Sequence, residues 1–370
     1  MSMRCNLCGE TASQPLELDE PVSKTGSNVI CRNCGLIYHD PVMSEEEIAE
    51  FYRHEYAGEY HDSTEMQLGL AASRINFLEK HVDSSTLSAT LEIGCARGDF
   101  LSEIKKRGAE VRGVEPSIQL SDMAKEKGLD VFTGRYEDLL EAESKYHLIC
   151  MFHVLEHVRN PIAILKRIRR ELKDDGKLFV EVPTIGDCQL SMVFKKIHPI
   201  TFVKETLIAV LQTAGFTPDA VEQRGYNLRV IASSCEVLRR VDYPDSGQIL
   251  AKVRQYLSQR RKVVDRVCSI LEKLVAQKEI AIYGAGHNTL DLSELFDLKR
   301  LDIVGVFDAD PAKQGKRLLG LNVQSPLALR EFYGGSVIIS SYGYQEEIEQ
   351  QLGYLCSRGV QLIKLYDKEK

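Results

Sequence analysis

A glycine-rich turn and an acidic residue that follows it have the types and the spacing of a nucleoside-binding site. The turn over 94–98 (GCARG) directly follows an apolar strand predicted over 89–93, and its mostly small residues let a ligand approach the backbone. Glu115 ends a second predicted strand, 110–114, about 20 residues after the turn begins, the offset at which a carboxylate accepts both ribose hydroxyls. Asp99 stands where a pyrophosphate-binding motif has its third glycine, and its charge would repel a phosphate. The pattern therefore predicts an adenosyl ligand with a zwitterionic tail.

These residues resemble the E-x-G-x-x-x-G motif of class I S-adenosylmethionine-dependent methyltransferases, and the resemblance extends to about Ser234. It implies an α/β, Rossmann-like methyltransferase domain over 86–240, with S-adenosyl-L-methionine as its cofactor. It also implies an adenine contact through Glu137 or Asp138, with a solvated loop as the alternative. A Rossmann-like turn that binds no ligand is the structural alternative to the whole site. The residues that the resemblance assigns to the cofactor are Glu92, Gly94, Cys95, Ala96, Gly98, Glu115, Pro116, Glu137, Asp138 and His153.

Three histidines are candidates for the chemistry of methyl transfer. The predicted strand 146–152 is apolar almost throughout, as a buried parallel strand should be, and it ends at His153, where ligands bind in doubly wound sheets. The string over 152–157 (FHVLEH) resembles the segment of small-molecule methyltransferases that borders the sulfonium and the substrate. Methyl transfer needs a positioned nucleophile and, for some acceptors, a base, for which a neutral imidazole of pKa about 6.5 is suited. The catalytic candidates are His198, His153 and His157.

Two other interpretations of these histidines stay open. His153 and His157 could support the fold by capping and hydrogen bonding, and His198 could cap a helix that starts near Thr201 or anchor the loop before it. A metal site made of His153, Glu156 and His157 has weak support, because the sequence shows no further ligand cluster beside them.

Four cysteines near the amino terminus have the spacing of a zinc knuckle. They form two C-x-x-C pairs with 22 residues between the pairs, and a glycine follows each pair. Two such turns direct four thiolates at one tetrahedral centre, and four sulfur ligands leave no position for water. We therefore expect a structural Zn²⁺ ion that folds residues 1–40, with redox disulfides as the alternative. Its ligands would be Cys5, Cys8, Cys31 and Cys34.

Length and charge narrow the class of protein. A chain of 370 residues is long enough for two or three domains, and its net charge of -7 argues against a nucleic-acid partner, which would need a basic face. We expect a small-molecule substrate instead. The sequence has no run of about 18 apolar residues and its amino terminus is polar, so we expect neither a membrane span nor a signal peptide, and a cytoplasmic location with reduced thiols.

The predicted helices and strands place this chemistry at one edge of a sheet. Ser117 caps the helix after Glu115, while Asn160 and Pro161 begin a helix that Gly176 is expected to end. Each of these helices returns the chain to the start of the next parallel strand, so the turns that carry the candidate residues meet at the carboxyl ends of the strands.

The flanks of this region are predicted from weaker patterns. An apolar helix over 204–211 precedes a hairpin of strands 217–224 and 228–234, which adds the antiparallel edge typical of methyltransferase sheets. Residues 41–85 are expected to form a helical, acidic connection or a lid. Its aromatic and imidazole side chains include Tyr52, Tyr56, Tyr60 and His61.

The carboxyl-terminal third reads as a linker helix followed by a second Rossmann-like domain. Residues 246–277 have a helical apolar stripe that includes Leu250 and Leu257, and residues 278–370 begin with a strand and a Gly-x-Gly turn at Gly284. Asp308 follows this turn after one more predicted strand, so a nicotinamide site is a competing interpretation. Thr289 occupies the place of the third glycine and weakens it.

The order of these three parts resembles three-domain methyltransferases of nucleotide-linked deoxysugars. The resemblance implies a class I methyltransferase sheet between an N-terminal zinc-binding module and a C-terminal Rossmann-like domain, with a nucleotide-sugar substrate. C-methylating members carry a Tyr-x-Glu-His segment that works in proton abstraction, and here it reads KKIH, so only His198 matches. Carbon, oxygen and nitrogen acceptors stay open, as does the oligomeric state. Lys195 and Lys196 could meet a substrate phosphate or form a solvated turn. The alternatives are an NAD-linked sugar oxidoreductase that uses Gly284, Gly286 and Asp308, and a scaffold without catalysis.

Overall fold

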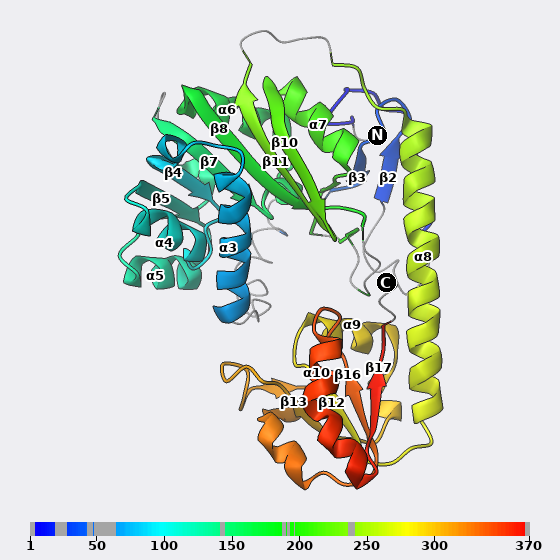
Figure 1. Ribbon diagram of the computed structural model, residues 1–370. Helices are drawn as coiled ribbons and strands as arrows, with labels where there is room; N and C mark the ends of the chain where they lie inside the picture. The colour runs from blue at the N-terminus through cyan, green and yellow to red at the C-terminus, as the bar shows by residue number, and fades with distance from the viewer. Residues whose placement is uncertain are drawn as a thin grey trace. The chain divides into compact units, whose positions relative to one another are not determined.

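The structure is a computed structural model, and it divides the chain into two compact units. The first unit holds most of the chain up to Arg254, and the second holds Gln255–Lys370 with two short earlier segments (Figure 1). The predicted aromatic and imidazole residues of the connection, from Tyr52 to His61, lie outside the described residues. The structure describes residues 4–18, 28–42, 47, 64–140, 145–186, 190, 193–195, 197–235 and 241–366.

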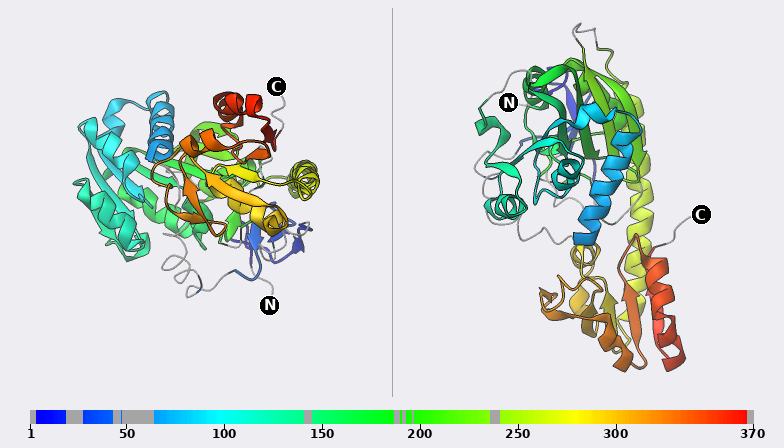
Figure 2. Two further views of the ribbon diagram at one scale, coloured as in Figure 1. Left: turned by 90° about the horizontal axis from the view of Figure 1, so that it is seen from below. Right: turned by 60° about the vertical axis from the view of Figure 1, so that its left-hand side comes forward.

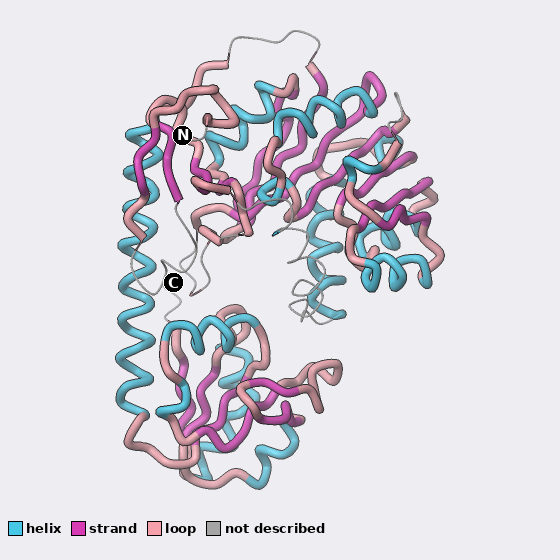
Figure 3. The backbone as a smooth tube through the Cα atoms, turned by 180° about the vertical axis from the view of Figure 1, so that it is seen from behind, coloured by secondary structure: helices cyan, strands magenta, loops and turns pink. Residues whose placement is uncertain are grey.

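A seven-stranded sheet forms the centre of the first unit. Its order is β10-β11-β8-β7-β4-β5-β6, with β4 to β8 parallel and β11 and β10 antiparallel to their neighbours. The predicted antiparallel hairpin at one edge is therefore confirmed. Figure 3 shows the strands of this sheet lying side by side, with helices beside them. The strands are β4 (Ala89–Ile93), β5 (Glu110–Glu115), β6 (Asp130–Thr133), β7 (Tyr146–Phe152), β8 (Leu172–Pro183), β10 (Phe216–Arg224) and β11 (Asn227–Ser234).

Helices cover both faces of this sheet. One hydrophobic core joins one face to α3 (Thr64–Glu79), α4 (Asp99–Lys106) and α5 (Ile118–Glu126). A second core joins the other face to α6 (Pro161–Glu171) and α7 (Lys204–Thr213). Helices α3 and α4 lie side by side in the views of Figures 1 and 2. This three-layer packing buries the parallel strands on both faces, which explains their continuous apolar runs.

Two of the predicted helix starts are confirmed, but one predicted helix end is wrong. The Ser117 side chain accepts from the backbone amide of Leu120, and that of Asn160 accepts from Ala163, as expected of caps. Helix α6 ends at Glu171 and not at Gly176, which lies inside β8. A Cβ at Gly176 would lie 2.9 Å from the Lys173 carbonyl oxygen, so this glycine serves a close approach of backbones and not a helix end.

The cysteine-bearing segment forms a small antiparallel sheet with the order β1-β2-β3-β9. Its first three strands are β1 (Ser13–Pro15), β2 (Asn28–Cys31) and β3 (Ile37–His39). The fourth, β9 (Ile200–Thr201), comes from the chain after β8, so this sheet shares a strand with the segment that contains His198.

The second unit contains a six-stranded sheet with the order β14-β15-β13-β12-β16-β17. All of its pairs except β14 with β15 are parallel, which is the expected Rossmann-like arrangement. Two helices, α9 (His287–Leu295) and α10 (Gln345–Leu352), belong to this unit. The strands are β12 (Ile280–Tyr283), β13 (Ile303–Phe307), β14 (Arg317–Leu318), β15 (Leu321–Gln324), β16 (Ser336–Ile339) and β17 (Gln361–Lys364).

The predicted linker helix is α8 (Ser246–Leu274), which begins in the first unit and continues in the second. Val253, Val267 and Leu274 of the predicted stripe are buried, whereas Leu250 and Leu257 are only half-buried. The buried positions are Ile249, Val253, Tyr256, Arg260, Val267, Leu271 and Leu274. Among the described helices, none is long and apolar enough to cross a membrane.

Candidate active site

The glycine turn joins the carboxyl end of β4 to α4 in a conformation that requires glycine. Gly94 and Gly98 have φ values of 73° and 72°, in the left-handed region that side chains disfavour. A Cβ at Gly94 would lie 2.4 Å from a methyl carbon of Val154, and one at Gly98 would lie 2.2 Å from a methyl carbon of Leu129. Both glycines are therefore required by contacts within the protein. The contact of Gly94 with Val154 also brings the turn beside the loop that carries His153.

The carboxylate of Glu115 lies against this turn, as its spacing predicted. Its Oε2 accepts from the backbone amide of Ala96 at 2.9 Å, and its Oε1 accepts from the amide of Ser117 at 2.8 Å. The side chain is buried, and burial raises its pKa to about 7 although both amides lower it. Pro116, between these contacts, is half-buried. The position suits an acceptor of ribose hydroxyls.

The loop after β6 reaches the same edge of the sheet. The amide of Gly134 donates to the carbonyl of Glu115 at 3.0 Å. Glu137 and Asp138 follow in a short 3-10 helix, Tyr136–Asp138, and both side chains are exposed. The Glu137 carboxylate pairs with Arg135 at 3.0 Å, and that of Asp138 accepts from the Arg135 amide at 3.3 Å. These contacts fit the solvated-loop alternative as well as an adenine contact, so the assignment stays a prediction.

Two further residues assigned to the cofactor point into the protein. Glu92 in β4 is 3% exposed, and its Oε2 has no hydrogen-bond partner within the described part of the chain. Burial raises the pKa of Glu92 to about 8. The Cys95 side chain packs towards Gly113, since a Cβ there would lie 2.5 Å from its Sγ. Cys95 can therefore face a ligand with its backbone only, whereas Glu92 retains an unsatisfied acceptor.

His153 lies at the carboxyl end of β7, as predicted, and its imidazole lies between two carboxylates. Its Nδ1 is 3.5 Å from Oε1 of Glu156, and its Nε2 is 3.4 Å from Oε1 of Glu181. Burial opposes the charged ring, but the hydrogen bonds with Glu156 and Glu181 outweigh it and raise the pKa to about 9. His153 is therefore a cation at neutral pH. Its φ of 55° places it in the left-handed region, an unusual backbone for a residue with a side chain.

Glu181 anchors a buried group of charges that the sequence analysis missed. Arg74 of α3 donates to its Oε1 at 2.6 and 3.0 Å, and Arg229 of β11 donates to its Oε2 at 2.5 Å. The Arg74 guanidinium also lies 4.2 Å from the centre of the Phe152 ring. Burial would raise the pKa of Glu181, but the arginines and His153 hold it well below its usual range. The sequence contained one indication of this group, a glutamate inside the apolar strand over 178–182, because a buried charge requires charged or hydrogen-bonding partners.

His157 and His198 lie together near Glu156, although they are far apart in the chain. Their ring centroids are 4.8 Å apart and the rings meet edge to face. The His157 Nδ1 lies 3.0 Å from the carbonyl of Ile197, and the His198 Nδ1 lies 3.1 Å from the carbonyl of Val193. Burial lowers the pKa of both rings, to about 3 for His198, where the charge of His157 adds to the effect. The ordinary pKa expected for His198 from the sequence is therefore wrong, and its ring is neutral at physiological pH.

The sequence provided only weak support for a metal site made of His153, Glu156 and His157. In the structure, a different group of three side chains brings its possible ligand atoms together. The possible ligand atoms of Glu156, His157 and His198 all lie within 4.8 Å of one another. Of the two predicted phosphate-binding lysines, Lys195 is exposed and Lys196 lies outside the described residues.

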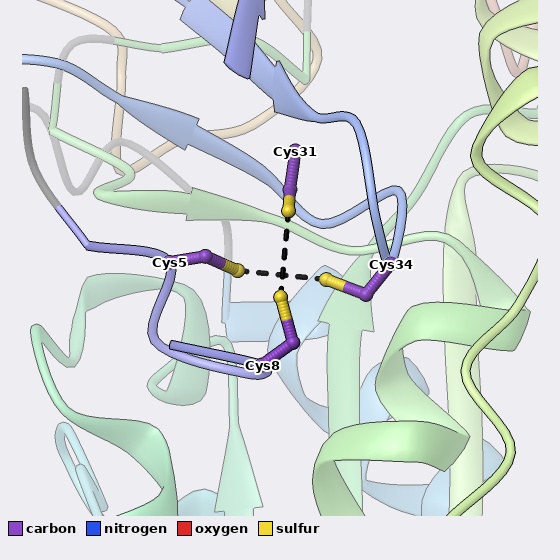
Figure 4. Close-up of side chains that lie close together, drawn as sticks. All are labelled: Cys5, Cys8, Cys31 and Cys34. Atoms are coloured by element: carbon purple, nitrogen blue, oxygen red, sulfur yellow. Dashed lines mark hydrogen bonds between the residues drawn. The ribbon is translucent and has the colours of Figure 1, made fainter. Parts of the chain in front are cut away.

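The four amino-terminal cysteines converge on one centre, with their sulfur atoms pointing at one another (Figure 4). The Sγ atoms of Cys5 and Cys34 are 3.5 Å apart, and so are those of Cys8 and Cys31. Each of these contacts joins one C-x-x-C pair to the other. Four sulfurs at about 2.3 Å from a tetrahedral zinc ion lie about 3.8 Å apart, so the arrangement fits one ion.

The second glycine turn repeats this geometry with one difference. The Asp308 Oδ2 accepts from the backbone amide of Ala285 at 2.7 Å, as Glu115 does from its own turn. It also accepts from Nζ of Lys313 at 3.1 Å, and Oδ1 accepts from the amide of Asp310 at 2.8 Å. The lysine takes the second lone pair of Oδ2, which leaves Asp308 fewer acceptor positions for a ribose than Glu115 has. The geometry therefore favours Glu115 over Asp308 as a ribose acceptor.

Comparison with known proteins matches the two compact units to two different family models. Residues 62–228 match the family model described as "Methyltransferase domain", and residues 276–358 match one described as "C2185-like, N-terminal". The ubiquinone biosynthesis O-methyltransferase of Idiomarina loihiensis is 30% identical over 115 residues, 29% of this chain and 46% of that protein. The chain thus spans about half the length of the curated relatives of this type.

Two further similarities differ in how much of the chain they cover. The C-methyltransferase NovU of Streptomyces niveus is 22% identical over 350 residues, 86% of this chain and 81% of that protein. The solved structure of the Burkholderia thailandensis 1,6-didemethyltoxoflavin-N1-methyltransferase covers 60% of this chain and 100% of that chain, at 16% identity and a TM-score of 0.42. The family match and the topology of the sheet agree: the chain carries a class I S-adenosylmethionine-dependent methyltransferase domain over residues 62–228.

Proposed function

We propose that this protein transfers a methyl group from S-adenosylmethionine to a saccharide, and that the saccharide is linked to a nucleotide. The observation that carries methyl transfer by the whole chain is the similarity to the C-methyltransferase NovU, which covers 86% of this chain and so includes sequence beyond the methyltransferase domain. The order of cysteine module, methyltransferase sheet and Rossmann-like sheet supports it, because it is the order of the sugar methyltransferases that the sequence resembles.

The residues around the glycine turn fit this cofactor. The Glu92 Oε2 is a buried acceptor that lacks a partner in the described structure, and the ammonium group of the methionine moiety would supply one. Each Glu115 oxygen accepts one backbone amide and has a further lone pair for a ribose hydroxyl. When bound, the cofactor supplies an electrophilic methyl group on a sulfonium.

The protein would then hold the acceptor atom in line with the methyl group and take up the proton that the acceptor loses. Both N–H groups of the cationic His153 face Glu156 and Glu181, so His153 would act through its charge, whereas the neutral His157 and His198 can accept a proton. The KKIH segment lacks the glutamate of the Tyr-x-Glu-His segment. Glu156 could replace that glutamate, because its carboxylate lies near the imidazole of His198. This arrangement supports proton abstraction from carbon or from oxygen. In this proposal the four cysteines hold a structural zinc ion and take no part in the chemistry.

The test uses the full chain, a labelled methyl donor and a pool of nucleotide sugars. We expect one sugar to gain one methylene and the label, and Glu115→Ala to slow the gain roughly 10- to 150-fold at a limiting donor concentration. In D2O with S-adenosylhomocysteine in place of the methyl donor, reversible abstraction from carbon would exchange the hydrogen on the acceptor carbon of the unmethylated sugar for deuterium. Oxygen methylation would leave carbon-bound hydrogen in place. Binding of S-adenosylhomocysteine without transfer to any saccharide would overturn the substrate class and leave the cofactor assignment intact.

A further inference from the structure

We propose that Glu156, His157 and His198 together bind one divalent transition-metal ion, separate from the cysteine site. The three residues come from two distant segments, the short 3-10 helix Leu155–His157 and the loop before β9. Their possible ligand atoms converge to within 4.8 Å of one another, and Glu156 and His198 are buried. Two imidazoles and one carboxylate are a common ligand set for zinc and for non-haem iron.

The backbone fixes the tautomer of both rings. The Nδ1 atoms of His157 and His198 face the carbonyls of Ile197 and Val193 at 3.0 and 3.1 Å. A carbonyl oxygen only accepts, so each Nδ1 must carry the proton in the neutral ring, and the lone pair is then on Nε2. Histidines that ligate a metal almost always donate their other ring N–H to such a group. Each imidazole would therefore ligate an ion through Nε2.

The carboxylate provides an independent observation. Glu156 is 1% exposed, and its Oε2 is buried with no hydrogen-bond partner within the described part of the chain. Its Oε1 lies 3.5 Å from Nδ1 of His153 and 3.9 Å from Nε2 of His157. A purely structural pair of histidines would account for the two carbonyl contacts, but not for a buried, unsatisfied carboxylate oxygen beside them. A cation bound by Glu156 would satisfy this oxygen.

The ligand types decide the kind of ion. Ligands at about 2.1 Å from one ion lie roughly 3 to 3.5 Å apart, so small side-chain movements from the present separations would close the site. Nitrogen ligands disfavour Mg²⁺ and Ca²⁺, which prefer oxygen. Three protein ligands leave at least one open position, which would take an oxygen of the acceptor. That role rests on the proposed function, whereas the ion site itself does not.

Cobalt(II) is a suitable probe, because its spectrum distinguishes nitrogen and oxygen ligands from thiolates. Full-length protein that carries zinc at its cysteines would be titrated with Co²⁺, followed by visible spectroscopy and by elemental analysis after gel filtration. We expect one additional equivalent of cobalt, with d–d bands and without a thiolate charge-transfer band. Glu156→Gln and His198→Ala should weaken binding at least about 100-fold. The exposed His81, changed to alanine, is the matched control and should leave binding unchanged.

The outcomes separate this inference from the proposed function. If His198→Ala does not fold, the nearly isosteric Glu156→Gln decides, with circular dichroism to show that it is folded. No additional equivalent, or one that both variants retain, would overturn the site, and a charge-transfer band would assign the cobalt to the cysteines. Calorimetry with S-adenosylhomocysteine on the same samples tests the cofactor site separately. Protein that binds this ligand but no additional ion contradicts only the inference made here.

Discussion

The backbone amide of Ala96 donates to the carboxylate of Glu115 at 2.9 Å, which ties the turn after β4 to the end of β5. The same carboxylate accepts from the amide of Ser117, so it joins two of the loops at the carboxyl edge of the sheet. Glu115 therefore has two functions to separate by experiment: holding the turn, and accepting the ribose hydroxyls of the cofactor.

Glu115→Ala should weaken S-adenosylhomocysteine binding by about 1.5–3 kcal/mol, the usual contribution of hydrogen bonds to a charged group. Calorimetry measures the affinity, and thermal unfolding without ligand measures the effect on the turn. Asp308→Ala is the matched control, because it removes the corresponding carboxylate from the second glycine turn. Equal affinities for wild type and Glu115→Ala would remove Glu115 from the cofactor site.

Residues 1–40 should bind one zinc ion through Cys5, Cys8, Cys31 and Cys34, because their sulfurs converge on one centre. Elemental analysis of protein purified without chelator should find about one equivalent at this site. Cys31→Ser should lower that content and destabilise the small sheet of β1, β2, β3 and β9. The exposed Cys356, changed to serine, should have no effect. A zinc content that Cys31→Ser does not change would contradict the assignment.

The positions of the glycine turn and of Glu115 could be predicted from the sequence, because they depend on local patterns. The turn at Gly94, the acid at Glu115 and the helix caps are set by residues within a few positions of one another or by a fixed strand–turn–helix repeat. The hairpin of β10 and β11 was also predictable, since two alternating segments flank a short turn. The roles of these residues towards a cofactor stay predictions.

The buried polar contacts around Glu181 and His198 could not be predicted, because they join distant segments. Glu181, Arg74 and Arg229 come from β8, α3 and β11, and no local pattern connects them. The meeting of His157 with His198 and the low pKa of His198 likewise depend on how the loop before β9 folds back and buries the ring. Sequence periodicity reports which face of a helix or strand is buried, and not which buried polar side chains meet.

The ion group around Glu181 should contribute strongly to stability. Arg74→Ala removes a buried cation, so the negative charge of Glu181 is less well neutralised in the protein interior. We expect a loss of about 3–5 kcal/mol in the free energy of unfolding. Arg107→Ala is the control, because its ion pair with Glu79 is exposed and should contribute less than about 1 kcal/mol. Urea denaturation at pH 7 measures both. Similar losses for the two variants would mean that the buried group is not strongly coupled.

The charge of His153 should make stability depend on pH. Its pKa rises from 6.5 to about 9 in the folded protein, so its contribution is fully present below pH 6.5 and is lost as the pH rises through 9. The ring is partly exposed, and after allowance for solvent screening the contribution should be about 1 kcal/mol. His153→Gln should therefore be less stable than wild type at pH 6, with the difference shrinking by pH 9.5 in urea denaturation. A constant difference across this range would show that folding does not raise the pKa of His153.

The role of His198 is decided by comparing rate with stability. The two roles proposed for His198, metal ligand and proton acceptor, use the same Nε2 lone pair, so the comparison is made in metal-free protein. If His198 is the proton acceptor there, its replacement by alanine should slow the chemical step by roughly 10²–10⁴-fold and leave the affinity for S-adenosylhomocysteine unchanged. Burial and His157 lower its pKa to about 3, so the wild-type rate should show no inflection near pH 6.5 that His198→Ala removes. A purely structural His198 would instead lower the melting temperature and leave the rate per folded molecule nearly intact.

His39 provides the matched control for this comparison. It is also buried, and its Nε2 lies 3.0 Å from the carbonyl of Lys195, so it anchors the same loop without belonging to the group of Glu156, His157 and His198. His39→Ala should lower the melting temperature and keep a near-normal single-turnover rate. Because both variants loosen the loop, a slow step in His198→Ala alone would assign the proton transfer to that imidazole, whereas equal rates in the two folded variants would exclude it as the base.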